Sequence, residues 1–230
     1  MNGSLEEVEA ILGYTFKDKS ILALGLTHSS YANDYLGGPT KGNERLEFLG
    51  DAILDMVVSA ELYDRFPEKQ EGFLTKLRAE IVCTEALGKT ADHYRLNEYM
   101  LMGKGEEAKG GRYRHSITSD LVEALIAAVF IDGGIEAAMK TVHKLMNYTI
   151  EKECSEPVIS DYKTQLQELV QRKSNQHISY VLVDESGPDH NKTFTFEVLI
   201  NCESAGRGSG RTKKEAEQMA ARRALEALHE

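Results

Sequence analysis

Apolar side chains recur at helical spacing through the first two thirds of the chain. Up to about Cys154, Leu, Ile, Ala and Met stand three and four positions apart, with Glu and other polar residues between them. This pattern predicts an all-α domain, which we place at residues 1–150. The next segment, residues 151–160, contains Pro157 and shows little periodicity, so we predict a linker there.

From Asp161 the hydrophobic pattern changes. After one helical stretch, β-branched and aromatic residues alternate with polar ones in two runs and a shorter third piece, before a final helical stretch. The expected elements are a helix at Asp161–Lys173, strands at His177–Asp184, at Thr193–Asn201 and near Ala205, and a helix at Thr212–His229. The order α-β-β-β-α predicts a small α+β domain over residues 161–230.

An acidic stripe marks one helix of the first domain. On a helix that begins near Asn43, four carboxylates share a sector of roughly 80° at about 100° per residue. They are Glu44, Glu47, Asp51 and Asp55. Like charges at this spacing weaken a helix, and no Lys or Arg lies within the stripe. A solvated polar face is the ordinary alternative. The expected apolar face opposite comprises Leu49, Ile53, Met56, Val57 and Ala60.

Two further residues of this helix do not fit a simple solvated face. Gly50 in a helix interior costs about 1 kcal/mol relative to Ala. A glycine there is easiest to explain if another backbone or a ligand approaches closely. Phe48 falls near the acidic sector rather than on the apolar face, which indicates a partner surface.

A second helix combines apolar residues with two carboxylates. The segment from Ser119 to Ile131 is apolar nearly all the way round, which predicts burial. Asp120 and Glu123 are its only charged residues and lie three positions apart, hence on one face. Buried carboxylates are rare unless they pair with a cation or bind a metal. The alternative is a helix N-terminus, where the dipole favours acidic residues.

If the two helices meet, they gather several carboxylates without a compensating base. These are Glu44, Glu47, Asp51, Asp120 and Glu123. Hard divalent cations take oxygen ligands, and Mg²⁺ is commonly held by a few carboxylates, water and substrate phosphate. No His/Cys cluster suits zinc and no Ser or Cys nucleophile with a paired base is evident; we interpret His28, near a helix end, as structural. The pattern therefore indicates a carboxylate-bound hard metal and a hydrolytic reaction.

Charge and cysteine content narrow the class of protein. The net charge of −10 argues against a nucleic-acid partner, but residues 161–230 carry 10 Lys and Arg against 11 Asp and Glu, so the acidity resides in the first domain. Three widely spaced cysteines indicate reduced thiols, and we expect a cytoplasmic protein. Neither a secretory signal nor an apolar run long enough to span a membrane is present, so we expect no membrane partner.

The segment Asn43–Ala52 resembles the signature of the ribonuclease III family. Three other segments resemble that family in the same order along the chain: Leu26–Asn33, Glu71–Leu74 and Asp120–Gly134. The resemblance covers essentially the whole chain. It implies an all-α endonuclease domain followed by a double-stranded-RNA-binding domain.

The resemblance also implies roles for six carboxylates. The residues that match the family's metal ligands are Glu47, Asp51, Asp120 and Glu123. Asp51 and Glu123 also match catalytic positions, and Glu44 and Glu71 match accessory acidic positions of the catalytic valley. None of these positions departs from the family's pattern, so the resemblance implies an active enzyme.

The implied reaction is hydrolysis of each RNA strand by a water activated by Mg²⁺, with Mn²⁺ as a substitute ion. It leaves 5′-phosphate and 3′-hydroxyl ends with short 3′ overhangs, in the processing of ribosomal RNA precursors and mRNA. The family's nuclease domains form a homodimer, and Phe48 fits a dimer contact.

The glycine-rich segment Gly103–Arg112 is not a phosphate-binding P-loop, because no Gly-Lys-Ser/Thr follows. The ordinary interpretation is a mobile connection between helices. The alternative is that its Lys and Arg side chains meet the RNA backbone.

The last helix begins with a basic cluster. Thr212 and Glu215 have capping-box spacing, which places Lys213 and Lys214 in the first turn. Cations there oppose the helix dipole, but a phosphate would interact favourably with both ammonium groups and with the helix N-terminus. A solvated lysine pair is the alternative.

The second domain also resembles the double-stranded-RNA-binding domain, which implies further contacts. Thr164, Gln167 and Glu168 are expected to face one minor groove, His190 a second, and the two lysines the phosphates between. Such recognition reads A-form shape and 2′-hydroxyl groups. No exposed aromatic platform for single strands is evident.

Two alternatives stay open at this point. The chain could be a non-catalytic double-stranded-RNA-binding protein on the same scaffold, although uncompensated acidic residues add nothing to the binding of a polyanion. It could also be a helical metal-binding or protein-interaction domain fused to an RNA module.

Overall fold

The computed structural model describes residues 4–155, 162–171, 176–188 and 192–229. The chain divides into two compact units, Met1–Cys154 and Ser155–Glu230, which are described separately below. Among the described residues, no helix combines the length and the apolar character that a membrane crossing requires.

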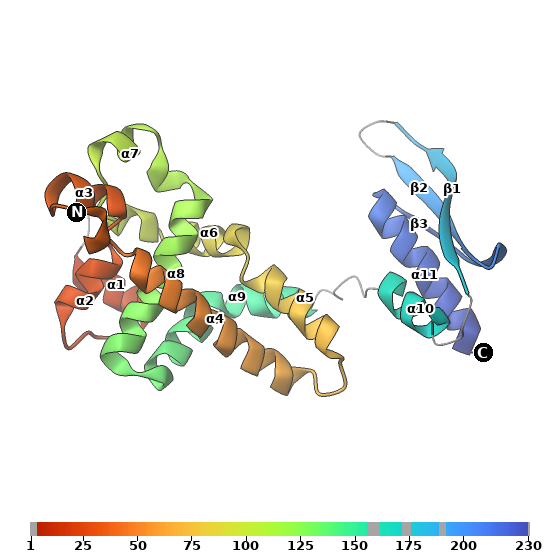
Figure 1. Ribbon diagram of the computed structural model, residues 1–230, viewed down its shortest axis with the longest axis horizontal. Helices are drawn as coiled ribbons and strands as arrows, with labels where there is room; N and C mark the ends of the chain where they lie inside the picture. Colours follow the sequence, from red (N-terminus) through yellow and green to blue (C-terminus); the bar gives the residue numbers. More distant parts are fainter. Residues whose placement is uncertain (1–3, 156–161, 172–175, 189–191, 230) are drawn as a thin grey trace. The chain divides into compact units, whose positions relative to one another are not determined.

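The first unit is built from helices and short 3₁₀ turns (Figure 1). The helices are α1 (Leu5–Leu12), α2 (Lys19–Gly25), α3 (Ser29–Tyr35), α4 (Glu44–Arg65), α5 (Glu71–Ile81), α6 (Thr84–His93), α7 (Lys104–Ala108), α8 (His115–Gly133) and α9 (Ile135–Ser155). The 3₁₀ turns are η1 (Pro39–Lys41), η2 (Leu96–Tyr99) and η3 (Gly111–Tyr113). The predicted all-α class of this domain is therefore confirmed.

Helix α8 forms the centre of this unit, and its most extensive contacts are with α4 and α6 (Figure 1). Its side chains from Leu121 to Val129 are buried except that of Glu123, which is half-buried. Burial on every side explains why the sequence of this helix is apolar nearly all the way round.

Gly50 lies where α4 and α8 meet. A Cβ atom added at this position would stand 1.9 Å from the carbonyl oxygen of Glu123. The predicted close approach of another backbone is therefore confirmed, and that backbone belongs to the second acidic helix. The glycine sets the distance between the two helices that carry the carboxylates.

The predicted apolar face of α4 is partly wrong. Ile53 and Val57 are buried as expected, but Met56 is 49% exposed and Ala60 is also exposed. The core side of α4 is instead completed by Leu46, Leu54, Val58 and Leu62. A helical wheel treats all apolar positions as core, so it cannot separate the core side of a helix from a second apolar stripe.

The predicted linker begins too early. Helix α9 continues to Ser155, so residues 151–155 are helical rather than part of a linker at 151–160. One reason is local: Arg65 of α4 forms ion pairs with both Glu61 and Glu151, and this ties the last turns of α9 to α4. Residues 156–161 lie outside the described part of the chain.

In its described residues, the second unit contains two helices and a three-stranded antiparallel sheet of order β1-β2-β3 (Figure 1). Its elements are α10 (Tyr162–Gln171), β1 (Ile178–Ser186), β2 (Thr193–Ile200), β3 (Glu203–Gly210) and α11 (Lys213–His229). The predicted α-β-β-β-α order is confirmed. The core of this unit is formed by Leu166, Val170, Phe196, Val198, Ala216, Ala220, Ala221, Ala224 and Leu225.

Strand β3 is longer than the short piece predicted near Ala205. The strand is difficult to predict from β-propensity because it contains several glycines, and glycine is depleted in strands. At Gly208 an added Cβ would stand 2.1 Å from the backbone nitrogen of Ala220. The glycines of β3 and the alanines of α11 therefore allow helix and sheet to pack backbone against backbone.

Candidate active site

Three carboxylates from α4 and α8 form one cluster. Glu47, Asp120 and Glu123 each offer an oxygen, and these oxygens lie within 4.8 Å of one another. All three residues are half-buried. The close contact at Gly50 brings the two helices together at this level. The predicted meeting of the two acidic helices is therefore confirmed.

Burial and mutual repulsion both act on the protonation of this cluster. Burial raises the pKa of Glu123 to about 8, with further contributions from Asp51, Asp120 and Glu47. Burial also raises the pKa of Glu47, and the charges of Asp120 and Glu44 add to the shift. For both residues, burial and neighbouring carboxylates therefore act in the same direction, against the charged form.

The pKa of Asp120 is affected by groups that act in opposite directions. Burial raises its pKa, while a hydrogen bond from the Ser119 hydroxyl (3.3 Å) and the neighbouring His28 act in the opposite direction. Helix α8 starts at His115, so Asp120 is its sixth residue and lies beyond the first turn. An N-terminal helix dipole therefore does not account for Asp120 or Glu123.

The other predicted acidic residues lie outside this group of three. Asp51 is one turn after Glu47 on α4 and is exposed, yet its charge acts on both Glu47 and Glu123. Glu44, the first residue of α4, is exposed and acts on Glu47. Asp55 lies 3.9 Å from the guanidinium of Arg78 on α5, so this end of the stripe has a counter-charge that the wheel did not show.

Glu71 is not brought into the cluster of three. It is the exposed first residue of α5, and its Oε1 accepts a hydrogen bond from the Thr75 hydroxyl at 2.8 Å. Its predicted accessory role stays a prediction.

His28 is a helix cap as well as a neighbour of the acidic cluster. Its Nδ1 accepts from the backbone N–H of Ser30 at 3.2 Å and lies 2.7 Å from the hydroxyl of the same residue, at the start of α3. The backbone N–H of Asn43 donates to the carbonyl of Thr27, which places His28 beside the start of α4. The sequence predicted only a structural role for this histidine, and its position beside the acidic cluster was missed.

The glycine-rich segment Gly103–Arg112 is held in place by contacts of Arg112. Arg112 donates to the carbonyls of Asn97 and Met100 and forms an ion pair with Glu107 of α7. The mobile connection predicted at Gly103–Arg112 is therefore wrong, because the segment forms α7 and enters η3. Arg112 is engaged within the fold, and only 18% of its side chain is exposed.

The predicted RNA-binding residues occupy two exposed places on the second unit. Thr164, Gln167 and Glu168 are exposed on one face of α10. Lys213 and Lys214 are the exposed first two residues of α11. His190 lies outside the described residues.

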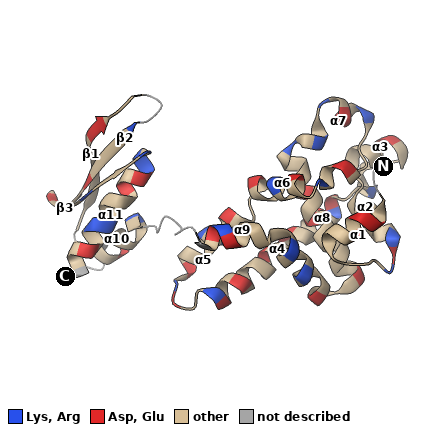
Figure 2. Cartoon of the chain, turned by 180° about the vertical axis from the view of Figure 1, so that it is seen from behind, with Lys and Arg blue, Asp and Glu red and all other residues tan. Residues whose placement is uncertain are grey.

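The start of α11 differs in detail from a capping box. The backbone N–H of Glu215 donates to the Thr212 hydroxyl at 3.1 Å, as expected. The Glu215 carboxylate, however, accepts from the backbone N–H of Arg211 at 2.8 Å rather than from that of Thr212. Acidic and basic residues are interspersed over both units (Figure 2), so the basic pair is a local feature.

Comparison with known proteins agrees with both parts of this arrangement. A family described as "Ribonuclease-III-like" matches residues 18–149, and the "Double-stranded RNA binding motif" matches residues 162–228. The chain is 45% identical to Ribonuclease 3 of Clostridium perfringens over 99% of this chain and 95% of that protein. It is 47% identical to Ribonuclease 3 of Caldanaerobacter subterraneus over 97% of this chain and 98% of that protein.

A solved structure shows the same nuclease fold. The nuclease domain of ribonuclease III from Campylobacter jejuni matches with a TM-score of 0.58 and 40% identity, over 64% of this chain and 95% of that chain. Matches at this identity and coverage establish descent as well as fold. The chain therefore belongs to the ribonuclease III family.

Proposed function

We propose that this double-stranded-RNA endoribonuclease holds Mg²⁺ at Glu47, Asp120 and Glu123, with Asp51 as a fourth carboxylate. The family is metal-dependent, and the chain carries an acidic cluster of matching type. The observation that supports the proposal most is the group of three oxygens within 4.8 Å on two helices. An all-oxygen donor set suits a hard cation such as Mg²⁺, with Mn²⁺ as a substitute.

In this proposal, different residues of the chain have different roles in hydrolysis. A bound divalent ion would supply charge neutralisation at the phosphodiester and a more acidic water. Glu47, Asp120 and Glu123 hold the ion, and Asp51 at the exposed edge faces both the cluster and incoming substrate. Glu44 and Glu71 extend the negative surface beside it. The products are 5′-phosphate and 3′-hydroxyl ends with short 3′ overhangs.

A gel assay with purified protein tests this function. A long RNA duplex is incubated with Mg²⁺ or with EDTA, beside single-stranded RNA and duplex DNA. We expect shortening of the RNA duplex only, and only with Mg²⁺. A duplex that is shifted but uncut with every metal would favour a non-catalytic RNA-binding protein. Absence of both cutting and shift would favour a protein-interaction domain.

The raised pKa of Glu123 leads to a pH-dependent effect of Mg²⁺ on stability. Between the ordinary value of 4.5 and about 8, the folded state holds a proton that the unfolded state has released. The free energy of unfolding of the metal-free protein therefore falls as pH rises through this window. Mg²⁺ binds the ionised carboxylate. Its binding is therefore expected to release protons from the protein and to restore the unfolding free energy that is lost as pH rises.

We therefore expect Mg²⁺ to raise the unfolding temperature more at pH 8 than at pH 6. Thermal unfolding with Mg²⁺ and with EDTA measures this, and calorimetric titration in two buffers counts the protons released. Equal stabilisation at both pH values with no proton release would contradict the placement of the metal at Glu123.

We propose that the second domain binds the RNA duplex through Thr164, Gln167 and Glu168, through His190, and through Lys213 and Lys214. The exposure of the α10 face and of the first turn of α11 supports this assignment. Contacts to phosphates contribute a salt-dependent, sequence-independent part of the affinity.

Lys213→Ala combined with Lys214→Ala is expected to weaken duplex binding and to lower the salt slope of the affinity by about 2, one for each phosphate contact. Fluorescence anisotropy between low and moderate salt measures both quantities. Arg223→Ala, a charge removed from the far part of the same helix, serves as control and should leave the slope unchanged. An unchanged slope in the double variant would place the lysines outside the RNA interface.

We propose that two copies of the chain pair through the nuclease domain, along an exposed apolar stripe of α4. Phe48 is 81% exposed, Met56 49% and Tyr63 72%. Ala52 and Ala60 are exposed between them, so the members of the stripe follow one another at spacings of four, four, four and three residues, which places them on one helix face. A contiguous apolar stripe on a soluble domain is typical of an interface. A Campylobacter jejuni relative is described as having a "region involved in dimer formation" in its nuclease domain.

Phe48→Glu is expected to convert the dimer into a monomer at micromolar concentration, because a charge would be buried without a partner. Sedimentation velocity measures the mass. Tyr113→Glu is the matched control, since Tyr113 is 71% exposed on η3. Dimers that persist in Phe48→Glu would place the interface elsewhere.

In the cell, the proposal extends to cytoplasmic processing of ribosomal, messenger and transfer RNA precursors.

A further inference from the structure

The start of the catalytic helix α8 is unusual in its charge. Its N-cap position, Arg114, makes no side-chain capping hydrogen bond, and its first turn contains no acidic residue. Three basic residues stand here instead: Arg112, Arg114 and His115. The N-terminus of a helix carries partial positive charge, so cations at this position are unfavourable unless other groups offset them.

Each of these basic residues has a carboxylate from a neighbouring helix. Arg112 pairs with Glu107 and Arg114 pairs with Glu106, both on α7. His115 lies against α6. Of the three, only histidine changes its charge near neutral pH.

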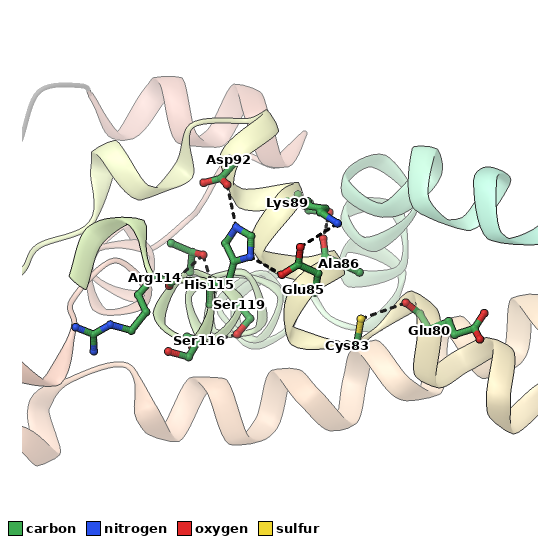
Figure 3. Close-up of polar contacts among 12 residues, drawn as sticks. Glu80, Cys83, Glu85, Ala86, Lys89, Asp92, Arg114, His115, Ser116 and Ser119 are labelled. Atoms are coloured by element: carbon green, nitrogen blue, oxygen red, sulfur yellow. Dashed lines mark hydrogen bonds and ion pairs between the residues drawn. The ribbon is translucent and has the colours of Figure 1, made fainter. Parts of the chain in front are cut away.

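His115 makes two contacts with α6, one through each ring nitrogen (Figure 3). Nδ1 lies 2.8 Å from Oε2 of Glu85, and Nε2 lies 3.1 Å from Oδ2 of Asp92. A neutral imidazole has one N–H donor, whereas the imidazolium has two. Both carboxylates accept only, so the two hydrogen bonds exist together only when the ring is protonated.

The ring has little freedom to leave this position. A Cβ added at Gly88 of α6 would stand 2.5 Å from the ring carbon Cγ of His115. The imidazole therefore lies directly against the backbone of α6, and 31% of its side chain is exposed. His115, at the first position of α8, thus connects this helix to two residues of α6, Glu85 and Asp92, which lie about two turns apart.

The other charged groups nearby do not replace this contact. Lys89 of α6 pairs with the second oxygen of Glu85 at 2.9 Å. Arg114 points away from the imidazole in Figure 3 and is engaged by Glu106. Charges that act on His115 come from Glu85 and Asp92, and both favour its protonated form.

We propose that His115, as an imidazolium, is a positioning residue that clamps the start of α8 to α6 and so holds Asp120 and Glu123 opposite Glu47. Asp120 and Glu123 follow His115 by about one and a half and about two turns of the same helix. This inference rests on the proposed metal-binding role of these carboxylates. The clamp itself can be measured without metal or substrate.

The pH range in which the clamp acts follows from the direction of the shift. A hydrogen bond to Glu85 raises the pKa of His115 above 6.5, and the bond to Asp92 adds to it. The folded state therefore gains stability from the imidazolium that is fully present below 6.5 and is lost as pH rises through the raised value. The clamp is therefore closed at pH values below the raised pKa of His115 and opens above it.

The first experiment compares unfolding temperatures in EDTA for the wild type, His115→Gln and His93→Gln. His93 is an exposed histidine at the end of α6 and provides the matched control. We expect the wild type to exceed His115→Gln by about 1–3 °C more at pH 6 than at pH 8.5, and His93→Gln to follow the wild type. A difference between wild type and His115→Gln that is the same at both pH values would overturn the proposal.

A ¹H–¹⁵N spectrum of the histidine side chains gives a direct second measurement. The His115 signal, identified by its loss in His115→Gln, should show both ring nitrogens protonated at neutral pH. A neutral single tautomer at pH 7 would overturn the clamp even if the variant proved unstable.

Cleavage kinetics then test positioning. At saturating Mg²⁺ and pH 7, His115→Gln should lower kcat by about two- to fivefold with KM unchanged. His115→Arg, which keeps a cation, should restore kcat. An equal kcat for wild type and His115→Gln would refute a positioning role. If the wild type does not cleave, the proposed function fails, while the unfolding and NMR measurements still decide on the clamp.

Discussion

Glu123→Gln is expected to lower kcat for duplex RNA by about 10³-fold while leaving duplex affinity almost unchanged. Glu123 belongs to the cluster of three carboxylates, and burial, followed by the charges of Asp51 and Asp120, raises its pKa to about 8. The amide keeps the shape of the side chain but removes one negative charge from the proposed ion site. A metal supplies several kcal/mol of transition-state stabilisation, which corresponds to this loss of rate.

The measurement combines single-turnover cleavage with anisotropy on the same duplex. Glu80→Gln provides the control, because Glu80 is an exposed glutamate of α5. It should cleave at the wild-type rate. The unfolding temperature of Glu123→Gln in EDTA should equal or exceed that of the wild type at pH 8, since a buried carboxylate charge is gone. Cleavage by Glu123→Gln at a normal rate would remove this residue from the active site.

The pairing of the two acidic helices was predictable because each left a local anomaly in the sequence. Two carboxylates on an otherwise apolar helix and a glycine inside an acidic helix both contradict local preference. The structure resolves both at one place, where Gly50 contacts Glu123. Local rules are broken most often where the chain has a function, so such residues are informative without a structure.

Other features depended on contacts that no local pattern contains. Asp55 belongs to the acidic stripe in sequence but lies near Arg78 of α5. Met56 belongs to the apolar face in sequence but is half exposed. Periodicity gives only the direction in which a side chain points around its helix. Whether that direction leads to the core, to a counter-ion or to a second molecule depends on the tertiary fold.

The contacts of His115 show the same limit more clearly. Glu85 and Asp92 precede it by more than 20 residues, and nothing near position 115 signals two carboxylates. From sequence alone, a histidine at the start of a helix is interpreted as an ordinary solvated side chain. Only the packing of α6 on α8 gives its protonation a consequence for the position of the active-site helix.

Gly50→Ala is expected to destabilise the nuclease domain by about 1–3 kcal/mol or more, even though alanine is the better helix former. The added methyl would stand 1.9 Å from the carbonyl oxygen of Glu123 and 2.4 Å from its carbonyl carbon. Both are backbone atoms, so a side-chain rotation cannot relieve the contact. One helix must move away from the other.

That movement would act directly on the carboxylate cluster, because Gly50 lies between Glu47 and Asp51 on α4. We therefore expect a fall in unfolding temperature of about 4–10 °C together with a weaker response to Mg²⁺. Gly72→Ala is the matched control: it is also a helical glycine, but its added Cβ would meet nothing within 4 Å. Gly72→Ala should be neutral or stabilising, by up to about 1 kcal/mol.

The comparison separates helix propensity from helix packing. If Gly50→Ala were as stable as Gly72→Ala and kept its response to Mg²⁺, the distance between α4 and α8 would not be set at this residue. If only Gly50→Ala lost stability and the Mg²⁺ response together, the missing methyl group at Gly50 would explain how two helices with mutually repelling carboxylates come close enough to form the proposed metal site.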